Sequence, residues 1–124
     1  MSQPREVFLV ERVGGTLVVV PQGPALNFRY PDVHRESNEL FRMMDGPDLN
    51  NVVIDLNAVD YVDSVIIGSI IRLLQKARVR RGRAVFCSAS QAMQEILKSI
   101  KIGTMWPLFA TRDEALAAIE AEST

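Results

Sequence analysis

The chain has 124 residues, of which 48% are hydrophobic, and a formal net charge of −1 at pH 7. This length fits one domain of ordinary size, and the apolar content is sufficient for a core between a sheet and several helices. A charge this close to neutral argues against a general binder of nucleic acid or of a membrane surface, because such proteins usually carry a clear basic excess.

Cysteine usage and hydropathy predict a cytoplasmic protein. The single cysteine, Cys87, cannot form an internal disulfide and stands in a strand-like run, so we expect a buried thiol in a reducing compartment. No apolar run approaches the roughly 18 to 20 residues that a membrane span needs. Residues 1–6 lack the apolar core of a signal peptide.

The first elements in chain order form a predicted β-hairpin. Residues 6–11 and 16–20 are apolar, β-branched-rich runs, and Gly14 and Gly15 between them are typical of a tight turn. Prolines and a glycine at 21–24 end the second strand.

A first helix is expected next, after an irregular stretch at 26–30. Pro31 should hold Tyr30 in an extended conformation, because the proline ring crowds the residue before it. The helix ends at the glycine-proline pair 46–47. Its apolar positions are Val33, Leu40, Phe41 and Met44.

The most informative stretch runs from residue 51 to residue 82. Val52–Leu56 is a short apolar run that predicts a buried strand. Asp63 is well placed as the N-cap of a following amphipathic helix, and Ser64 then stands at its first position, near the positive end of the helix dipole. Gly82 is expected to turn the chain out of this helix.

The last third predicts two more strands and two more helices. Residues 83–87 form a strand, and Ser90 caps a helix that Gly103 closes. Residues 105–109 form an apolar connector or a short edge strand. The final helix opens on a capping box made by Thr111 and Glu114.

Alternating strands and helices predict an α/β fold with parallel strand pairs and one antiparallel hairpin. We expect a mixed sheet of four to five strands packed with about four helices. The chain 1–124 is interpreted as a single domain with its core at about 6–120, because no repeat or long linker divides it.

Ser64 has two interpretations. It is either a serine that helps to start a helix or a hydroxyl that is modified. A phosphate there would add about −1.5 to −2 charges and three acceptor oxygens, and a helix N-terminus tolerates such an anion. Asp60 and Asp63 would oppose the added charge and make the modified patch strongly anionic.

No other constellation predicts catalysis or a cofactor. Asp55, Asp60 and Asp63 have the chemistry of an Mg²⁺ site, but a turn-and-cap role is favoured because no further acidic pair or late lysine accompanies them. His34 is the only histidine and is expected to be solvated, so nucleophilic catalysis has no base.

Two surface segments have open interpretations. The basic run 76–83 is expected to be a solvated helix end. The connector 105–109 is either core cover or a docking patch, and Trp106 is the best candidate for a surface anchor.

From about Val7 to Ile119 the chain resembles a STAS domain, the fold of anti-sigma-factor antagonists. The resemblance is carried by the strand at 52–56, by Y-V-D-S-V-I-I-G-S-I-I at 61–71, by the strand at 85–88, and by I-L-K-S-I-K-I before the last helix. It implies a non-enzymatic bacterial regulator without cofactor or metal, which binds proteins and neither nucleic acid nor membrane.

In the family, a partner serine kinase that doubles as an anti-sigma factor phosphorylates the serine after the aspartate. The unphosphorylated form binds this kinase and frees the sigma factor. The resemblance places the acceptor on Ser64 and the preceding acid on Asp63. It places the Leu-Asp pair after the second strand on Leu26-Asn27. The expected partner surface comprises Asn27, Asp60, Asp63 and Ser64.

The sequence departs from the family pattern at two places. Val65 and Ile66 replace Ser/Thr-Gly after the serine, and Asn27 replaces a carboxylate. The alternative is therefore a constitutive scaffold or an oligomerising module in a signalling complex, which is never phosphorylated. Homo-oligomers through STAS surfaces are among the possible partners. A metal- or nucleotide-dependent enzyme acting at the Asp55–Asp63 loop is a third hypothesis.

Overall fold

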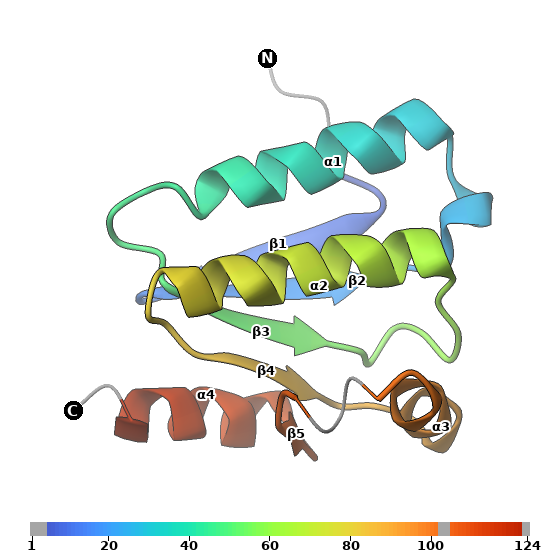
Figure 1. Ribbon diagram of the computed structural model, residues 1–124. Coiled ribbons are helices and arrows are strands. Elements are labelled where there is room, and N and C mark those ends of the chain that lie inside the picture. The colour runs from blue at the N-terminus through green and yellow to red at the C-terminus, as the bar shows by residue number, and fades with distance from the viewer. Residues whose placement is uncertain (1–4, 102–104, 123–124) are drawn as a thin grey trace.

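The computed structural model describes residues 5–101 and 105–122. They form one α/β domain around a five-stranded sheet with the order β1-β2-β3-β4-β5 (Figure 1). The predicted fold class is confirmed. The elements are β1 (Phe8–Val13), β2 (Thr16–Pro21), the 3-10 helix η1 (Ala25–Asn27), α1 (Tyr30–Met43), β3 (Asn51–Asp55), α2 (Ser64–Val79), β4 (Ala84–Cys87), α3 (Gln91–Ser99), β5 (Leu108–Phe109) and α4 (Arg112–Glu122).

The predicted hairpin is confirmed, with the first strand two residues later than expected. β1 pairs antiparallel with β2, and Val13 faces Thr16 across the turn. Gly14 has a φ of 58°, a conformation that glycine adopts without steric cost. The remaining neighbours β2–β3, β3–β4 and β4–β5 pair in parallel, as the alternation of strands and helices predicted.

The start of α1 differs from the prediction. Tyr30 is the first helical residue, and the extended cap is Arg29, with φ −73° and ψ 135°. The predicted extended conformation of Tyr30 is therefore wrong. Pro31 lies in the first turn, where its missing N–H has no helical acceptor to lose, so the helix accepts it.

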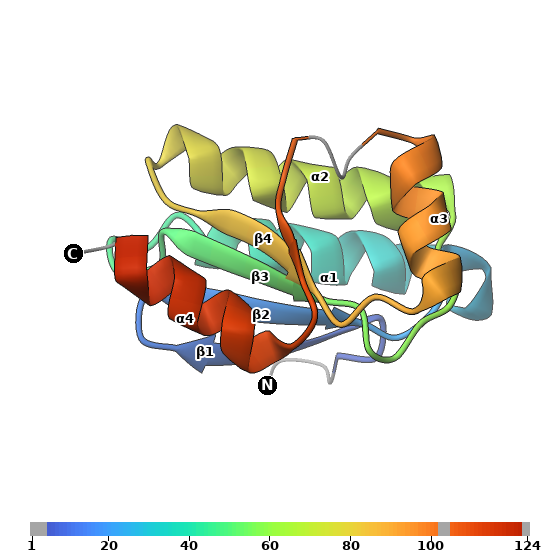
Figure 2. The same cartoon turned by 90° about the horizontal axis from the view of Figure 1, so that it is seen from below.

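Helices cover both faces of the sheet and enclose two apolar clusters. α1 and α2 lie on one face, α4 lies on the other, and α3 stands at one end of the sheet (Figures 1 and 2). The larger cluster lies between α1, α2, α3 and the sheet. The smaller cluster packs α4 against the opposite face and comprises Val18, Val53, Val85, Cys87, Ala115 and Ile119.

Burial of the Cys87 thiol has a pH-dependent consequence. Desolvation, with a smaller contribution from the Asp55 carboxylate, raises its pKa from 9.0 to about 11. The unfolded chain then loses the thiol proton first as pH rises, so the stabilising effect is full below pH 9.0 and disappears as pH climbs toward 11.

We therefore expect Cys87→Ala to show a smaller loss of unfolding free energy than the parent chain between pH 9 and pH 11. The native thiol should also resist iodoacetamide at pH 8, because the thiolate is the reactive form. Urea titrations at several pH values measure the difference between the two chains. Identical pH profiles would contradict the buried, neutral thiol.

Two of the predicted caps are present in the last third of the chain. The Ser90 hydroxyl accepts a bond from the Met93 N–H at 3.1 Å, and the Thr111 hydroxyl accepts one from the Glu114 N–H at 3.1 Å. Gly103, the expected end of the third predicted helix, lies outside the described residues.

The connector 105–109 ends in the short edge strand β5, as predicted. Trp106 is only 5% exposed and belongs to the larger cluster, so the interpretation as core cover is confirmed and the surface-anchor prediction for Trp106 is wrong. Its large apolar ring is stabilised by burial against the core, whereas its neighbour Met105 remains exposed.

The exit from α2 also differs from the prediction. The left-handed residue is Arg81, with a φ of 63°, and Gly82 follows it. The Gly82 N–H donates to the Ala77 carbonyl at 2.8 Å and the Arg81 N–H donates to the Arg78 carbonyl at 2.9 Å, which is the bond pair of a Schellman motif. Glycine is needed at 82 for a different reason, because a Cβ there would lie under 3.0 Å from the Asn50 carbonyl.

Candidate functional site

The candidate site lies in the loop between β3 and the start of α2. The first residues of this loop are fixed by side-chain contacts. The Asp55 carboxylate is buried and accepts a bond from the Asn57 N–H at 3.0 Å. Its second oxygen pairs with Arg112 of α4 at 2.8 Å. Val59 and Val62 of the loop are buried in the larger cluster. These anchors position the residues that follow.

Asp63 caps α2, as predicted. Its backbone is extended, with φ −94°, and its carboxylate accepts a bond from the Ile66 N–H at 3.2 Å. Such a cap contributes about 1 kcal/mol to helix stability. Ser64 is the first helical residue, as predicted, and it is exposed.

The rotation of α2 decides what surrounds the Ser64 hydroxyl. Ile66 and Ile70 are completely buried, so the helix turns that face inward. Val65 remains 42% exposed beside Ser64, and Tyr61 of the preceding loop is 53% exposed. The serine is therefore an exposed hydroxyl among exposed apolar side chains. We call Tyr61, Ser64 and Val65, together with Leu26, the Ser64 surface.

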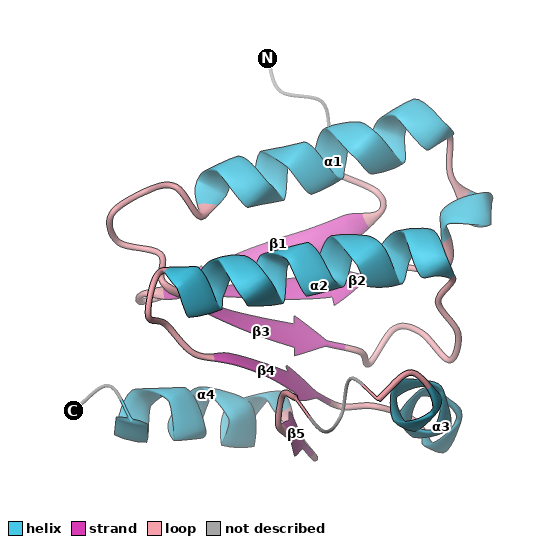
Figure 3. Cartoon of the chain, viewed as in Figure 1, coloured by secondary structure: helices cyan, strands magenta, loops and turns pink. Residues whose placement is uncertain are grey.

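Leu26 comes from η1, which lies at the same end of the molecule as the start of α2 (Figure 3). Leu26 is 78% exposed, and Asn27 is exposed beside it. The Asn27 amide lies close to Gly23, because a Cβ on that glycine would be 3.0 Å from its nitrogen. The structure thus brings the predicted residue Asn27 to the end that carries Ser64.

The three predicted acidic residues, Asp55, Asp60 and Asp63, have different roles in the structure. Asp60 is exposed, Asp63 caps the helix and Asp55 is held by Arg112. Within residues 5–101 and 105–122, no three side chains of His, Cys, Asp or Glu gather in a way that suits a metal ion. His34 is exposed on α1 and packs edge-to-face against Tyr30, with ring centroids 4.4 Å apart.

Sequence reasoning missed Arg112. This residue opens α4 and joins two carboxylates, Asp55 of β3 and Glu11 of β1, at 2.8 and 2.7 Å. The Asp55 carboxylate, as both hydrogen-bond and charge partner, raises the pKa of Arg112. No local signal links residues 11, 55 and 112, because they meet only when α4 packs on the sheet. The triad anchors the base of the β3–α2 loop.

The family profile described as STAS domain matches residues 8–115. The chain belongs to the STAS domain family. No curated protein matches it.

Solved structures of STAS proteins align along nearly the whole chain. An anti-sigma-factor antagonist (STAS) domain protein from Planctomyces limnophilus is 26% identical, with a TM-score of 0.75, and the alignment covers 91% of this chain and 97% of that one. Unphosphorylated SpoIIAA, an anti-sigma-factor antagonist, aligns at 16% identity with a TM-score of 0.77, covering 92% of this chain and 96% of that one. Phosphorylated SpoIIAA of Bacillus aligns at 18% identity with a TM-score of 0.70, covering 90% and 98%.

At 16% and 18% identity the two SpoIIAA structures establish the common fold alone. The STAS domain described here resembles anti-sigma-factor antagonists, a family of regulators. Among the described residues, no helix is both long and apolar enough to span a membrane.

Proposed function

We propose that this STAS domain is a non-enzymatic regulator of the anti-sigma-factor-antagonist kind, acting in the bacterial cytoplasm. In this proposal, a partner serine kinase that is also an anti-sigma factor binds the unmodified Ser64 surface and phosphorylates Ser64. The observation that carries the proposal is the exposed Ser64 hydroxyl at the first position of α2, directly after the Asp63 cap.

The physical effect of phosphorylation follows from the surroundings of Ser64. The phosphate would add about −1.5 to −2 charges at the start of α2, where exposed N–H groups and the helix dipole tolerate an anion. Tyr61 and Val65 beside it are exposed apolar side chains suited to burial by a partner. A partner that covers them would have to desolvate the new anion, with Asp60 adding repulsion, so binding would be lost.

The related structures support this proposal. The Planctomyces limnophilus protein is described as an anti-sigma-factor antagonist, and SpoIIAA is known in unphosphorylated and phosphorylated forms. If this chain works in the same way, Ser64 is the residue that changes between its two forms.

The test is to incubate the chain with candidate serine kinases and ATP and to locate phosphate by mass spectrometry. We expect phosphate on Ser64 and none on Ser64→Ala, while Ser99→Ala, which removes another exposed serine hydroxyl, keeps the label. Ser64→Asp should weaken kinase binding and change the unfolding free energy by less than about 1 kcal/mol, a typical limit for exposed positions. Phosphate only at other residues, with every cognate kinase tried, would contradict the proposal.

The exposed Val65 favours a second candidate function. An apolar side chain directly after Ser64 suits a permanent protein contact as well as a reversible one. On this alternative the domain is a constitutive scaffold or homo-oligomer. Size-exclusion chromatography distinguishes the two candidate functions. A large assembly whose size does not change on phosphorylation favours the scaffold, whereas a monomer that binds a kinase favours the phosphorylation-controlled regulator.

A further inference from the structure

The end of α2 opposite Ser64 carries a concentration of positive charge. The segment 76–83 holds Lys76, Arg78, Arg80, Arg81 and Arg83 and no acidic residue. We call Arg78, Arg81 and Arg83, with the exposed apolar residues Val79 and Met105 near them, the basic end. The 16 residues of α2 span about 24 Å, so the basic end is well separated from the Ser64 surface.

Much of this charge has no matching carboxylate within the described part of the chain. Lys76 pairs with Asp45. Arg80 donates to the Gly46 carbonyl at 2.6 Å and to the Asn50 side-chain oxygen at 3.2 Å, and both acceptors are neutral. Among residues 5–101 and 105–122, Arg78 and Arg81 form no ion pair.

A cavity of about 320 Å³ opens between the end of α2 and residues 105–107, with Arg78 and Arg83 among its walls. The Arg78 guanidinium carbon lies over the Trp106 ring, 5.4 Å from its centroid, and this cation–π contact helps to position the group. Its N–H donors lie in the plane of the group and suit a carboxylate. The residues lining the cavity are Arg78, Gly82, Arg83, Ala84, Met105, Trp106 and Pro107.

The backbone that presents the arginines is fixed by several bonds. The Schellman motif closes α2, and Arg81 is held left-handed directly before Gly82. The Arg83 N–H donates to the Asn51 side chain at 2.8 Å, which ties the turn to the start of β3. A preorganised turn loses little conformational freedom when a ligand binds, so charge contacts here contribute more to affinity.

Exposed apolar side chains border the charge. Val79 is 79% exposed and Met105 is 52% exposed. A cavity walled by arginines and bordered by exposed apolar groups resembles a protein-binding surface more than a site for a nucleic-acid backbone, which needs an extended basic stripe. The net charge of −1 also does not favour a general binder of nucleic acid.

We propose that the basic end is a second docking surface, and that its occupant is an acidic segment of a partner protein. Carboxylates of that segment pair with Arg78 at the cavity and with the exposed Arg81 beside it, and an apolar side chain of the segment covers Met105. Because this surface and the Ser64 surface lie at opposite ends of α2, the two engage different partners at the same time. The inference does not depend on phosphorylation of Ser64.

The test is an NMR titration of the ¹⁵N-labelled full chain with a hexaglutamate peptide at low salt, with hexaglutamine as the neutral control. We expect saturable shifts at residues 78–84 and at the Trp106 indole N–H, with hexaglutamate only, and their loss at high salt. Arg81→Ala and Arg78→Gln should each weaken binding about two- to fivefold, the range for an exposed ion pair. Arg29→Ala removes the same charge from the cap of α1, which begins at the other end of the molecule (Figure 1), and should leave binding unchanged.

Three results would overturn the proposal. One is the absence of saturable shifts at the basic end. Another is an equal loss of affinity in Arg29→Ala, which would mean a diffuse charge effect. The third is a stronger response of the same resonances to oligothymidylate than to hexaglutamate, which would assign the surface to nucleic acid. Thermal melts of Arg78→Gln and Arg81→Ala keep a folding defect from being mistaken for lost binding.

Discussion

Replacing Gly82 with alanine is expected to destabilise the domain by about 3 kcal/mol, the upper range for forcing extra volume into a packed site. A Cβ at this position would lie under 3.0 Å from backbone atoms of Asn50, a separation that real Cβ atoms essentially never show. Backbone has no alternative rotamer, so either the start of β3 or the end of α2 must shift. Urea denaturation measures the loss.

Gly68→Ala is the matched control, because it adds the same methyl group to another glycine, one that lies inside α2. A Cβ at Gly68 meets nothing within 4 Å, and the position is exposed inside α2. Alanine has the higher helix propensity, so this variant should gain about 0.5 to 1 kcal/mol. If the two variants were equally stable, the close packing of Gly82 on Asn50 would be refuted.

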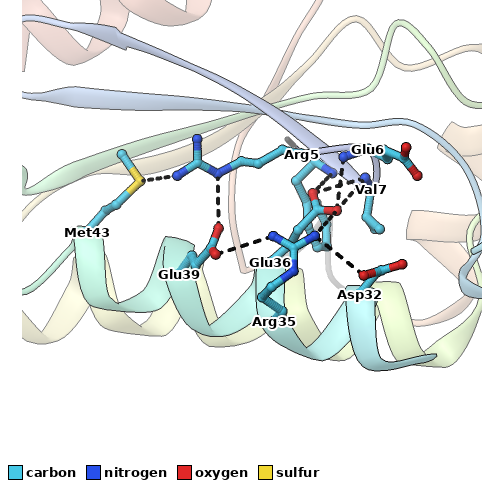
Figure 4. A network of polar contacts seen from close by, with 9 residues as sticks. Arg5, Glu6, Val7, Asp32, Arg35, Glu36, Glu39 and Met43 are labelled. Atoms are coloured by element: carbon cyan, nitrogen blue, oxygen red, sulfur yellow. Dashed lines mark hydrogen bonds and ion pairs between the residues drawn. The ribbon is translucent and has the colours of Figure 1, made fainter. Parts of the chain in front are cut away.

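Glu36→Ala is the second change expected to have a large effect. The Glu36 side chain is completely buried on α1, and its carboxylate accepts bonds from the N–H groups of Glu6, Val7 and Phe8 at 2.9 to 3.1 Å (Figure 4). Alanine would leave these donors at the start of β1 without an acceptor. We expect a loss of about 3 kcal/mol in unfolding free energy, since an unsatisfied buried group costs about 1–3 kcal/mol.

Two further variants separate this effect from a general loss of charge. Glu39→Ala removes a carboxylate one turn later that forms partly exposed ion pairs with Arg5 at 3.5 Å and Arg35 at 3.3 Å, and it should cost less than about 1 kcal/mol. Glu36→Gln keeps one acceptor oxygen and should fall between the two. Hydrogen exchange at Val7 and Phe8 should accelerate in Glu36→Ala alone. Similar losses in Glu36→Ala and Glu39→Ala would contradict the bonding role of Glu36.

The glycine and glutamate results bear on different parts of the domain. Gly82 fixes how the end of α2 packs against the residue before β3, and it lies at the basic end. Glu36 holds the N-terminal part of β1 to α1. A Gly82 variant could lose more affinity for hexaglutamate than its fraction of unfolded chain explains. That result would show that the rigid turn contributes to binding of the peptide.

Local sequence signals predicted the elements and the candidate hydroxyl well. Asp63, Ser90 and Thr111 each accept a bond from the backbone N–H three residues later, as their position before an apolar periodic run indicated. The two-residue turn at Gly14 and Gly15 was equally clear. Caps and tight turns are formed by residues that are close in the sequence, so a short stretch of sequence is sufficient to predict them.

Predictions that needed knowledge of distant partners were wrong or absent. The burial of Trp106 depends on the larger core cluster, and Gly82 is required by Asn50, 32 positions earlier in the chain. The Arg112 pairs with Asp55 and Glu11 join three elements with no common local pattern.

By itself, the sequence determined the order of strands and helices, the place of Ser64 at the head of α2 and the family resemblance. Only the tertiary structure decided which side chains are covered, which charges are paired and where Leu26 and Asn27 lie relative to Ser64. Helix caps and hydrophobic periodicity act over a few residues, whereas burial and ion pairing depend on segments that meet only when helices pack on the sheet.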